Sequence, residues 1–342
     1  MSPTLEEVAQ IAGVSRSTVS RVVNDHPNVR SETRAKVQEA IRESGYRPHS
    51  VARSLATNRT RIIGMVIPES VTTIFTDPYF PLLLRGATES CSAHQYQLLL
   101  SLFTSRDEEN EMYERVLLNG YLDGIVVSSA PRGDTLITRA LDDGIPAIFI
   151  GRHPDQSVPY VDSDNIGGAR MAVEHLIRLG YHRIATITGR QDLSSGKDRL
   201  EGYQQALRIH AIPLDERLVA PGDFTQSSGT DGMRKLLPLR PDAVFVASDS
   251  MAIGAMKVIR EADLRVPDDI AIVGFDDSPS ALAVEPPLTT VRQPIERMGA
   301  MAVEILLSRL DGMGREPGQG PALTNRVVLP TELVVRASCG IG

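Results

Sequence analysis

The sequence predicts a small all-α unit at the amino terminus, followed by a two-lobed α/β body with two parallel sheets. Three observations support this prediction. The first sixty residues show short amphipathic helical patterns with capping residues. From Arg61 onward, short β-branched runs alternate with helical stretches, as parallel βαβ units require. At 342 residues, the chain has enough length for two or three domains.

The first two expected helices are joined by a tight glycine turn. Thr4 and Glu7 form a capping box, so we expect a helix over residues 5–12 that ends at Gly13. Ser15 is placed to cap the next helix. Two helices with so short a connection are typical of a helix-turn-helix.

The second helix has two chemically different faces. Its apolar face carries Val19, Val22 and Val23. Its polar face carries Ser17, Ser20, Arg21 and Asn24. A third helix, which begins after Ser31 and ends before Gly45, completes a unit of roughly forty residues. So small a core has little material for anything except holding a helix at a defined angle.

The polar face suits duplex DNA, because a helix-turn-helix places the start of its second helix in the major groove. Arg16 and Arg21 suit guanine edges, whereas Ser15, Thr18 and Asn24 suit phosphate oxygens. An ordinary three-helix bundle with a solvated polar face is the alternative, and composition alone leaves it open.

The charge is distributed unevenly. Residues 1–61 contain ten basic and six acidic side chains, for a net charge of +4, whereas the remaining residues carry −11. This asymmetry suggests that only the amino-terminal unit meets a polyanion. The chain has no apolar run near the length of a membrane span and no signal-peptide pattern at its start, so we expect a cytoplasmic protein. Cys91 and Cys339 have no spacing that indicates a disulfide framework or a zinc site.

A fourth short helix is expected over residues 49–58. It follows Pro48 and places Val51, Ala52 and Leu55 on one stripe. At about two turns it is too short to be stable alone in water. It is therefore either a plain linker or a segment that folds against a partner.

The body contains two series of alternating strands and helices. The first has strands over 61–67, 96–102, 124–129 and 146–151, with helices near 79–93, 107–119 and 134–143. The second has strands over 183–189, 242–248 and 269–275, with helices near 167–179, 199–210, 227–237 and 250–262. Two such series predict two lobes. We expect 288–294 to cross back to the first lobe with a helix over 295–310, and 325–336 to return to the second.

Ligands of open α/β sheets bind beyond the carboxyl ends of the strands. The polar residues expected at those ends are Ser128, Ser129, Arg152, Asp249, Asp276 and Asp277. Arg199 opens a helix and Phe224 lies in a loop. Charged groups that bind vicinal hydroxyls and an aromatic face that packs on a ring together suit a small polar ligand. Taken alone, each is equally consistent with a helix cap or a surface ion pair, and Asp249 with an N-cap.

Three other functional classes fit the sequence less well. The chain lacks the phosphate-binding, nucleophile-elbow and zinc-protease motifs of common enzymes, and it implies no cofactor or metal. An exported sugar-binding protein would have a signal peptide and no DNA-reading unit. A scaffold without ligand would not need polar residues at strand ends. The remaining class is a ligand-controlled DNA-binding protein, for which we expect a homodimer on a pseudo-palindromic site.

The stretch TLEEVAQIAGVSRSTVSRVVN, residues 4–24, resembles the head signature of LacI/GalR-type bacterial transcription repressors. The resemblance implies that Arg16, Ser17 and Arg21 read bases. It places Ser15, Thr18, Ser20 and Asn24 near the DNA backbone. It makes residues 49–58 a hinge helix that orders on DNA and pairs in the minor groove, with Val51 and Ala52 on its apolar stripe and Leu55 as the wedge.

The body is similar to the periplasmic-binding-protein fold of the same family. This similarity implies a DNA-binding domain over 1–47, a hinge over 48–60 and an effector-binding and dimerisation domain over 61–342. Within that domain we expect an N-lobe over about 61–160 and 292–322, and a C-lobe over about 161–290 and 323–342.

The resemblance also assigns effector contacts. Arg199 and Asp276 match the most regular contacts, Phe224 the stacking aromatic, and Gln293 the crossover contact. Tyr79, Arg152 and Ser248 line the same region, to which the strand-end rule adds Ser128 and Asp249. The stretches GRHPDQ, VDSDN and KDRLEGY are similar to those of members that sense α-glucosides or related sugars. We therefore expect a repressor of sugar-utilisation genes. A bound sugar should relieve the repression and so induce these genes.

Overall fold

The computed structural model describes residues 3–23, 26, 28–46, 59–131, 133–155, 157–312 and 326–340. The chain divides into two compact units, Met1–Arg61 and Ile62–Gly342. In the described part of the chain, no helix is both long and apolar enough to cross a bilayer.

The first unit contains the three helices that the sequence predicts, namely α1 (Leu5–Ala12), α2 (Arg16–Val23) and α3 (Ser31–Ser44). The capping box is confirmed, because Thr4 Oγ1 accepts from the Glu7 amide at 3.3 Å and Glu7 Oε2 accepts from the Thr4 amide at 2.8 Å. Gly13 ends α1 with a φ of 62°, where glycine has no Cβ to clash. Val8, Val19 and Val37 are fully buried and form the centre of this unit.

Four residues with an expected DNA-binding role lie outside the described residues. They are Asn24, which the sequence assigns to the second helix, and Val51, Ala52 and Leu55 of the expected hinge.

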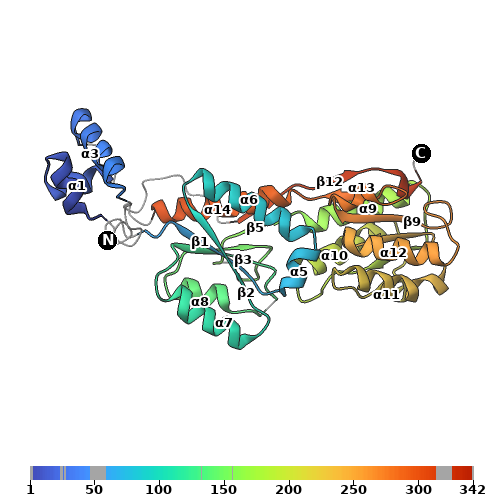
Figure 1. Cartoon of the computed structure of the whole chain (residues 1–342). Helices are drawn as coiled ribbons and strands as arrows, with labels where there is room; N and C mark the ends of the chain where they lie inside the picture. The colour runs from blue at the N-terminus through green and yellow to red at the C-terminus, as the bar shows by residue number, and fades with distance from the viewer. Residues whose placement is uncertain are drawn as a thin grey trace. The chain divides into compact units, whose positions relative to one another are not determined.

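The second unit contains two sheets, as predicted, and each has six strands (Figure 1). The first sheet has the order β11-β5-β4-β3-β1-β2 and is parallel throughout. Its strands are β1 (Ile62–Ile67), β2 (Gln97–Leu102), β3 (Gly124–Ser128), β4 (Ala147–Ile150), β5 (Tyr160–Ser163) and β11 (Arg326–Leu329).

The second sheet has the order β12-β10-β9-β8-β6-β7, and only the edge pair of β10 and β12 is antiparallel. Its strands are β6 (Ile184–Ile187), β7 (Val219–Ala220), β8 (Ala243–Val246), β9 (Ala271–Asp276), β10 (Thr289–Arg292) and β12 (Glu332–Val334). The central strands β6, β8 and β9 are buried along their length, as expected for strands covered on both faces.

Helices cover both faces of each sheet (Figure 1). In the first lobe, α6 (Tyr79–Ala93) and α14 (Ile295–Gly312) share one apolar core with the sheet. Opposite them lie α7 (Arg106–Met112), the π-helical turn η1 (Tyr113–Leu117) and α8 (Leu136–Asp142). In the second lobe, α9 (Asn165–Arg178) and α10 (Ser194–Ile209) cover one face, whereas α11 (Gln226–Leu236) and α12 (Asp249–Glu261) cover the other.

The carboxyl-terminal strands differ from the expected arrangement. We assigned residues 323–342 to the second lobe, but Arg326–Leu329 pairs in parallel with β5 in the first sheet. Only Glu332–Val334 joins the second sheet, where it pairs with β10. Pro330 separates the two strands, because proline has no amide hydrogen for a sheet and interrupts the ladder. The chain therefore passes between the lobes after β5, after β10 and after β11.

Candidate functional site

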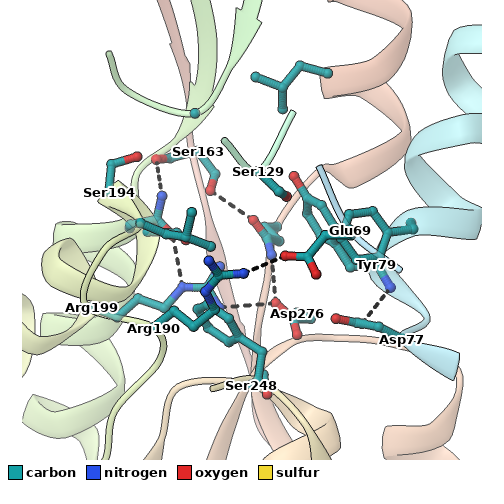
Figure 2. A pocket seen from close by; sticks show the side chains of 18 of the residues that line it. Glu69, Asp77, Tyr79, Ser129, Ser163, Arg190, Ser194, Arg199, Ser248 and Asp276 are labelled. Carbon is teal, nitrogen blue, oxygen red and sulfur yellow. Dashed lines mark hydrogen bonds and ion pairs between the residues drawn. The ribbon is translucent and has the colours of Figure 1, made fainter. Parts of the chain in front are cut away.

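A cavity of about 420 Å³ lies between the two lobes of the body (Figure 2). Its wall is built largely from residues that follow strands, since the carboxyl ends of both sheets face it. In the first sheet, Glu69, Ser129 and Gly151 follow β1, β3 and β4. Ser163 is the last residue of β5. In the second sheet, Arg190, Ser248 and Gln293 follow β6, β8 and β10. Asp276 is the last residue of β9.

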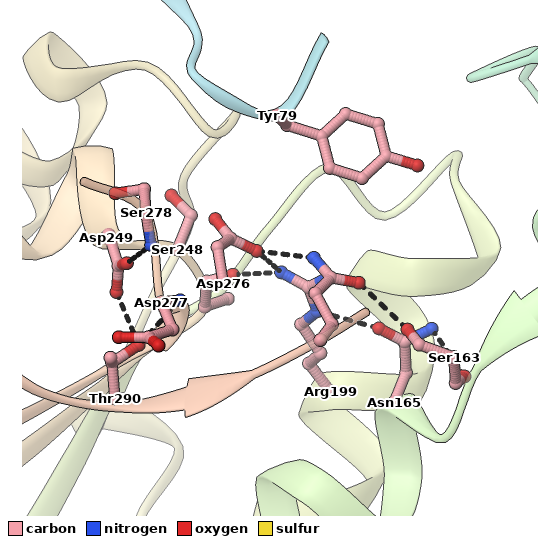
Figure 3. Close-up of polar contacts among 12 residues, drawn as sticks. Tyr79, Ser163, Asn165, Arg199, Ser248, Asp249, Asp276, Asp277, Ser278 and Thr290 are labelled. Carbon is pink, nitrogen blue, oxygen red and sulfur yellow. Dashed lines mark hydrogen bonds and ion pairs between the residues drawn. The ribbon is translucent and has the colours of Figure 1, made fainter. Parts of the chain in front are cut away.

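Arg199 and Asp276 form the polar centre of the cavity floor (Figure 3). The Arg199 Nη1 atom lies 3.3 Å from Asp276 Oδ1. Gln293 Nε2 donates to the same carboxylate oxygen at 2.6 Å. Arg199 and Asp276 are only 4% and 8% exposed. Neither of these contacts uses the second Asp276 oxygen, which is therefore available to a hydroxyl group in the cavity.

The Arg199 guanidinium is held by the second lobe on several sides. Its Nε donates to Asn165 Oδ1 at 2.9 Å, and its Nη1 donates to the Ala247 carbonyl at 2.6 Å. Its carbon lies 3.8 Å from the centre of the Phe275 ring. These contacts fix the orientation of the guanidinium before any ligand arrives, which lowers the entropy cost of recognition.

Burial raises the pKa of several carboxyl groups that line the cavity. Burial raises the pKa of Asp276 well above the ordinary range, although the neighbouring Arg199 charge opposes this shift. Burial also raises the pKa of Asp162 to about 7 and the pKa of Asp77 to a smaller extent. Such carboxyls gain most from a ligand that donates hydrogen bonds to them, and a neutral polyhydroxyl compound is such a ligand.

Phe224 supplies the aromatic face of the site. Its backbone φ of 75° directs it from the loop before α11, and the Arg199 guanidinium carbon lies 5.6 Å from its ring centre. A Cβ atom at Gly189 would lie 2.1 Å from the Phe224 Cζ atom. Glycine at this position therefore leaves the space that the Phe224 ring occupies, and the face of the ring is suited to stacking on a sugar.

Two ion pairs join the lobes beside the cavity. Glu69 of the first lobe lies 2.5 Å from Arg190 Nη1 of the second, and Asp192 holds the other edge of this guanidinium at 2.7 Å. Arg152 of the first lobe pairs with Asp198 of α10. Both pairs form only when the lobes are close together.

Six of the nine expected effector residues lie on the cavity wall. They are Tyr79, Arg199, Phe224, Ser248, Asp276 and Gln293. The other three, Ser128, Arg152 and Asp249, are not among the lining residues. Ser128 is fully buried as the last residue of β3, and its neighbour Ser129, which follows the strand with a φ of 58°, lines the cavity instead.

The Asp249 carboxylate is hydrogen-bonded within the second lobe and does not line the cavity. Its carboxylate accepts from the Ser278 amide at 2.7 Å and from the Thr290 hydroxyl at 2.6 Å. Ser248, one residue earlier, caps α12, so Asp249 is not the N-cap that the sequence allowed. Asp277, which follows β9, is held by Arg292 at 2.7 Å and by Arg336 at 2.5 Å.

Several lining residues escaped the sequence analysis. The strand-end rule applies to Glu69 and Arg190, which follow β1 and β6 by two and three residues. Asp162 and Ser163 had no such signal, because the four-residue strand β5 was not predicted. Within the described ranges, no group of His, Cys, Asp and Glu side chains is arranged to hold a metal ion.

In the first unit, the structure separates the two faces of α2. Ser15, Arg16, Ser17 and Arg21 are exposed, whereas Val19 and Val22 are buried. Thr18 and Ser20 lie at the boundary and are half-buried. Arg16 Nε lies 3.0 Å from Glu6 Oε1 with both side chains exposed. Such an ion pair is worth about 0–1 kcal/mol, so it hardly hinders the guanidinium from reaching another partner.

Family comparisons match both units of the chain. Residues 4–49 match the model described as bacterial regulatory proteins of the lacI family. Residues 173–339 match the model of a periplasmic binding protein-like domain.

Individual proteins are similar over nearly the whole chain. The HTH-type transcriptional regulator CelR of Thermobifida fusca is 42% identical and covers 98% of both chains. A solved complex of the transcriptional regulator CelR with cellobiose superposes with a TM-score of 0.76 at 40% identity, covering 98% of this chain and 99% of that one. The Lac repressor dimer bound to operator and the anti-inducer ONPF gives a TM-score of 0.84 at 30% identity, covering 99% of each chain.

Proposed function

From the premise that this chain belongs to the LacI family of bacterial regulatory proteins, we propose that it represses sugar-utilisation genes under the control of a bound sugar. Membership makes the chain a DNA-binding transcription regulator of the cytoplasm and not an enzyme. The sugar occupies the cavity between the lobes and sets the operator affinity.

One observation supports a sugar more than any other small ligand. The cavity floor combines the buried pair of Arg199 and Asp276 with the aromatic ring of Phe224. A carboxylate and a guanidinium bind adjacent hydroxyls, and an aromatic ring packs on the apolar face of a pyranose. The cavity offers no excess of positive charge that would favour a phosphate or a dicarboxylate, because five carboxyl groups line it beside two arginines.

Within the sugars, we propose a β-linked glucose disaccharide of the cellobiose type. The solved complex of the CelR regulator contains cellobiose, and that protein is 40% identical to this chain. The α-glucoside that the sequence suggested receives no support from the comparisons. A cavity of about 420 Å³ falls within the usual range for small-molecule sites.

We propose that the protein works as a homodimer on a pseudo-palindromic operator. The similar Lac repressor structure is a dimer on its operator. Arg16, Ser17 and Arg21 read bases, whereas Ser15, Thr18, Ser20 and Asn24 contact the backbone. Val51, Ala52 and Leu55 form the hinge contacts, with Leu55 as the minor-groove wedge.

The sugar controls DNA binding through the relation between the lobes. A ligand shifts a conformational equilibrium only by its differential affinity for the two states. The cavity takes residues from both lobes, for example Glu69 and Arg190, so its affinity for a ligand depends on how the lobes are apposed. We expect the bound sugar to lower operator affinity, which makes it an inducer.

The experiment combines operator titration with thermal unfolding. Cellobiose should raise the unfolding temperature of the wild-type chain and weaken operator binding. The Asp276→Asn variant should bind operator like wild type but lose both responses, because asparagine keeps the shape and removes the carboxylate. The Asp231→Asn variant changes an exposed aspartate outside the cavity, so it is the matched control and should respond normally. A normal sugar response of Asp276→Asn would place the effector site elsewhere.

A further inference from the structure

Polar groups line the cavity at two depths. On the floor, the side chains of Arg199 and Asp276 are 5% and 10% exposed. At the mouth, the side chains of Arg190 and Glu69 are 27% and 16% exposed. We call Glu69 and Arg190 the rim pair. All four residues line the same cavity (Figure 2), so a ligand that fills it contacts both pairs.

We propose that the rim pair is a second sugar subsite, which recognises the second ring of a disaccharide while the floor holds the first. This inference rests on the sugar-effector function proposed above and adds the residues that select ligand length. Neither Glu69 nor Arg190 was among the effector contacts expected from the sequence.

The rim pair has the chemistry of a hydroxyl-binding site. Arg190 Nη1 lies 2.5 Å from Glu69 Oε1, and Asp192 accepts from Arg190 Nε at 3.1 Å and Nη2 at 2.7 Å. The guanidinium is therefore held in one orientation by carboxylates on two sides. The second oxygen of Glu69 and the remaining hydrogen of Nη1 can accept from and donate to two neighbouring hydroxyls.

The floor pair has few unused groups left for a second ring. Arg199 already donates to Asn165, Ala247 and Asp276, and the Phe224 ring offers one stacking face. A second ring therefore needs polar partners of its own. The rim pair provides them from both lobes, which makes recognition of the second ring depend on lobe closure.

A rival explanation is that the rim pair acts only as a latch between the lobes. A latch stabilises the closed state for every ligand. Its loss would therefore weaken the binding of a monosaccharide and of a disaccharide by the same factor. A subsite for the second ring affects only the ligand that reaches it. The ratio of the two losses therefore separates the explanations.

The test measures glucose and cellobiose affinities of the full chain by isothermal titration calorimetry. Glu69→Gln should lower the affinity for cellobiose about tenfold or more, because hydrogen bonds to a charged group are lost. The affinity for glucose should change less than about twofold. Arg190→Gln is the second variant and should show the same pattern. Glu111→Gln removes an exposed glutamate that pairs with Arg115 at 2.6 Å, so it is the matched control and should change neither affinity.

Each other outcome overturns a defined statement. Equal losses for the two sugars, or no loss for either, would overturn the rim subsite in favour of a latch or of no role. Wild-type binding of glucose alone would overturn the subsite and leave the sugar-effector function standing. Wild-type binding of neither sugar would overturn the proposed effector class and the subsite together.

Discussion

Replacement of Arg199 by methionine is expected to destabilise the ligand-free body by about 3–5 kcal/mol at neutral pH. Arg199 is buried, donates to Asn165 and Ala247, and lies 3.3 Å from the Asp276 carboxylate. Methionine keeps much of the packing against the Phe275 ring in the core, but it donates no hydrogen bond.

The size of the stability loss follows from the buried polar groups that lose Arg199 as their partner. Each buried polar group that loses its partner costs about 1–3 kcal/mol, and an unpaired buried carboxylate costs more. Cavity water can hydrate Asp276 and Asn165 in part, since both line the cavity. The total is therefore smaller than the sum of isolated penalties.

The loss should also depend on pH. Burial raises the folded-state pKa of Asp276 above its unfolded value, and the Arg199 charge is the largest influence that lowers it. Without Arg199 the folded-state pKa rises further. A carboxyl group with a raised folded-state pKa costs stability progressively as the pH rises from the ordinary carboxyl range toward that pKa. Wild type and variant share this cost up to the wild-type pKa of Asp276, so the extra loss of the variant appears above that pKa and should be larger at about pH 9 than at about pH 5.

Urea unfolding followed by circular dichroism at the two pH values measures this loss. The control is Arg217→Met, which removes an exposed arginine paired with Asp215 at 2.8 Å and should leave the unfolding midpoint nearly unchanged. A loss below about 1 kcal/mol for Arg199→Met at the higher pH, or the same loss at both pH values, would refute the reasoning.

Three further changes test other parts of the molecule. Arg16→Ala should relax base preference at one operator position by about 1–3 kcal/mol, and an unchanged preference in a randomised-site selection would remove its base-reading role. Leu55→Ser should weaken specific operator binding while sugar-induced thermal stabilisation persists, whereas equal operator affinity in a titration would exclude the wedge. Gly189→Ala should push the Phe224 ring aside, because the added Cβ would lie 2.1 Å from its Cζ atom. Its sugar affinity, measured by calorimetry, should fall about tenfold or more with operator binding kept; unchanged affinity would contradict a stacking role for Phe224.

Local sequence rules predicted the first unit well. The capping box at Thr4 and Glu7, the stop at Gly13 and the apolar spacing of Val19 and Val22 act within one or two helical turns. Such signals need no knowledge of the rest of the chain, because capping and helical periodicity are local properties.

The strand-end rule found the region of the cavity but not the direction of every side chain. It named Ser128 beside Ser129, and only Ser129, with a φ of 58°, faces the cavity. It named Asp249, which is instead bonded to Ser278 and Thr290. A side chain's direction depends on the backbone at the strand end and on what packs beside it, and neither is written in a strand pattern.

The sequence by itself determined most of the helices and strands, though not β5, and also which face of α2 is polar and where along the chain a ligand site arises. Only the tertiary structure decided that β11 joins the first sheet, and that Glu69 lies against Arg190 across 121 positions of sequence. The physical reason is the separation in sequence over which each kind of interaction acts. Helical spacing and caps act between neighbouring residues, whereas strand partners and ion pairs between lobes depend on how the whole chain packs.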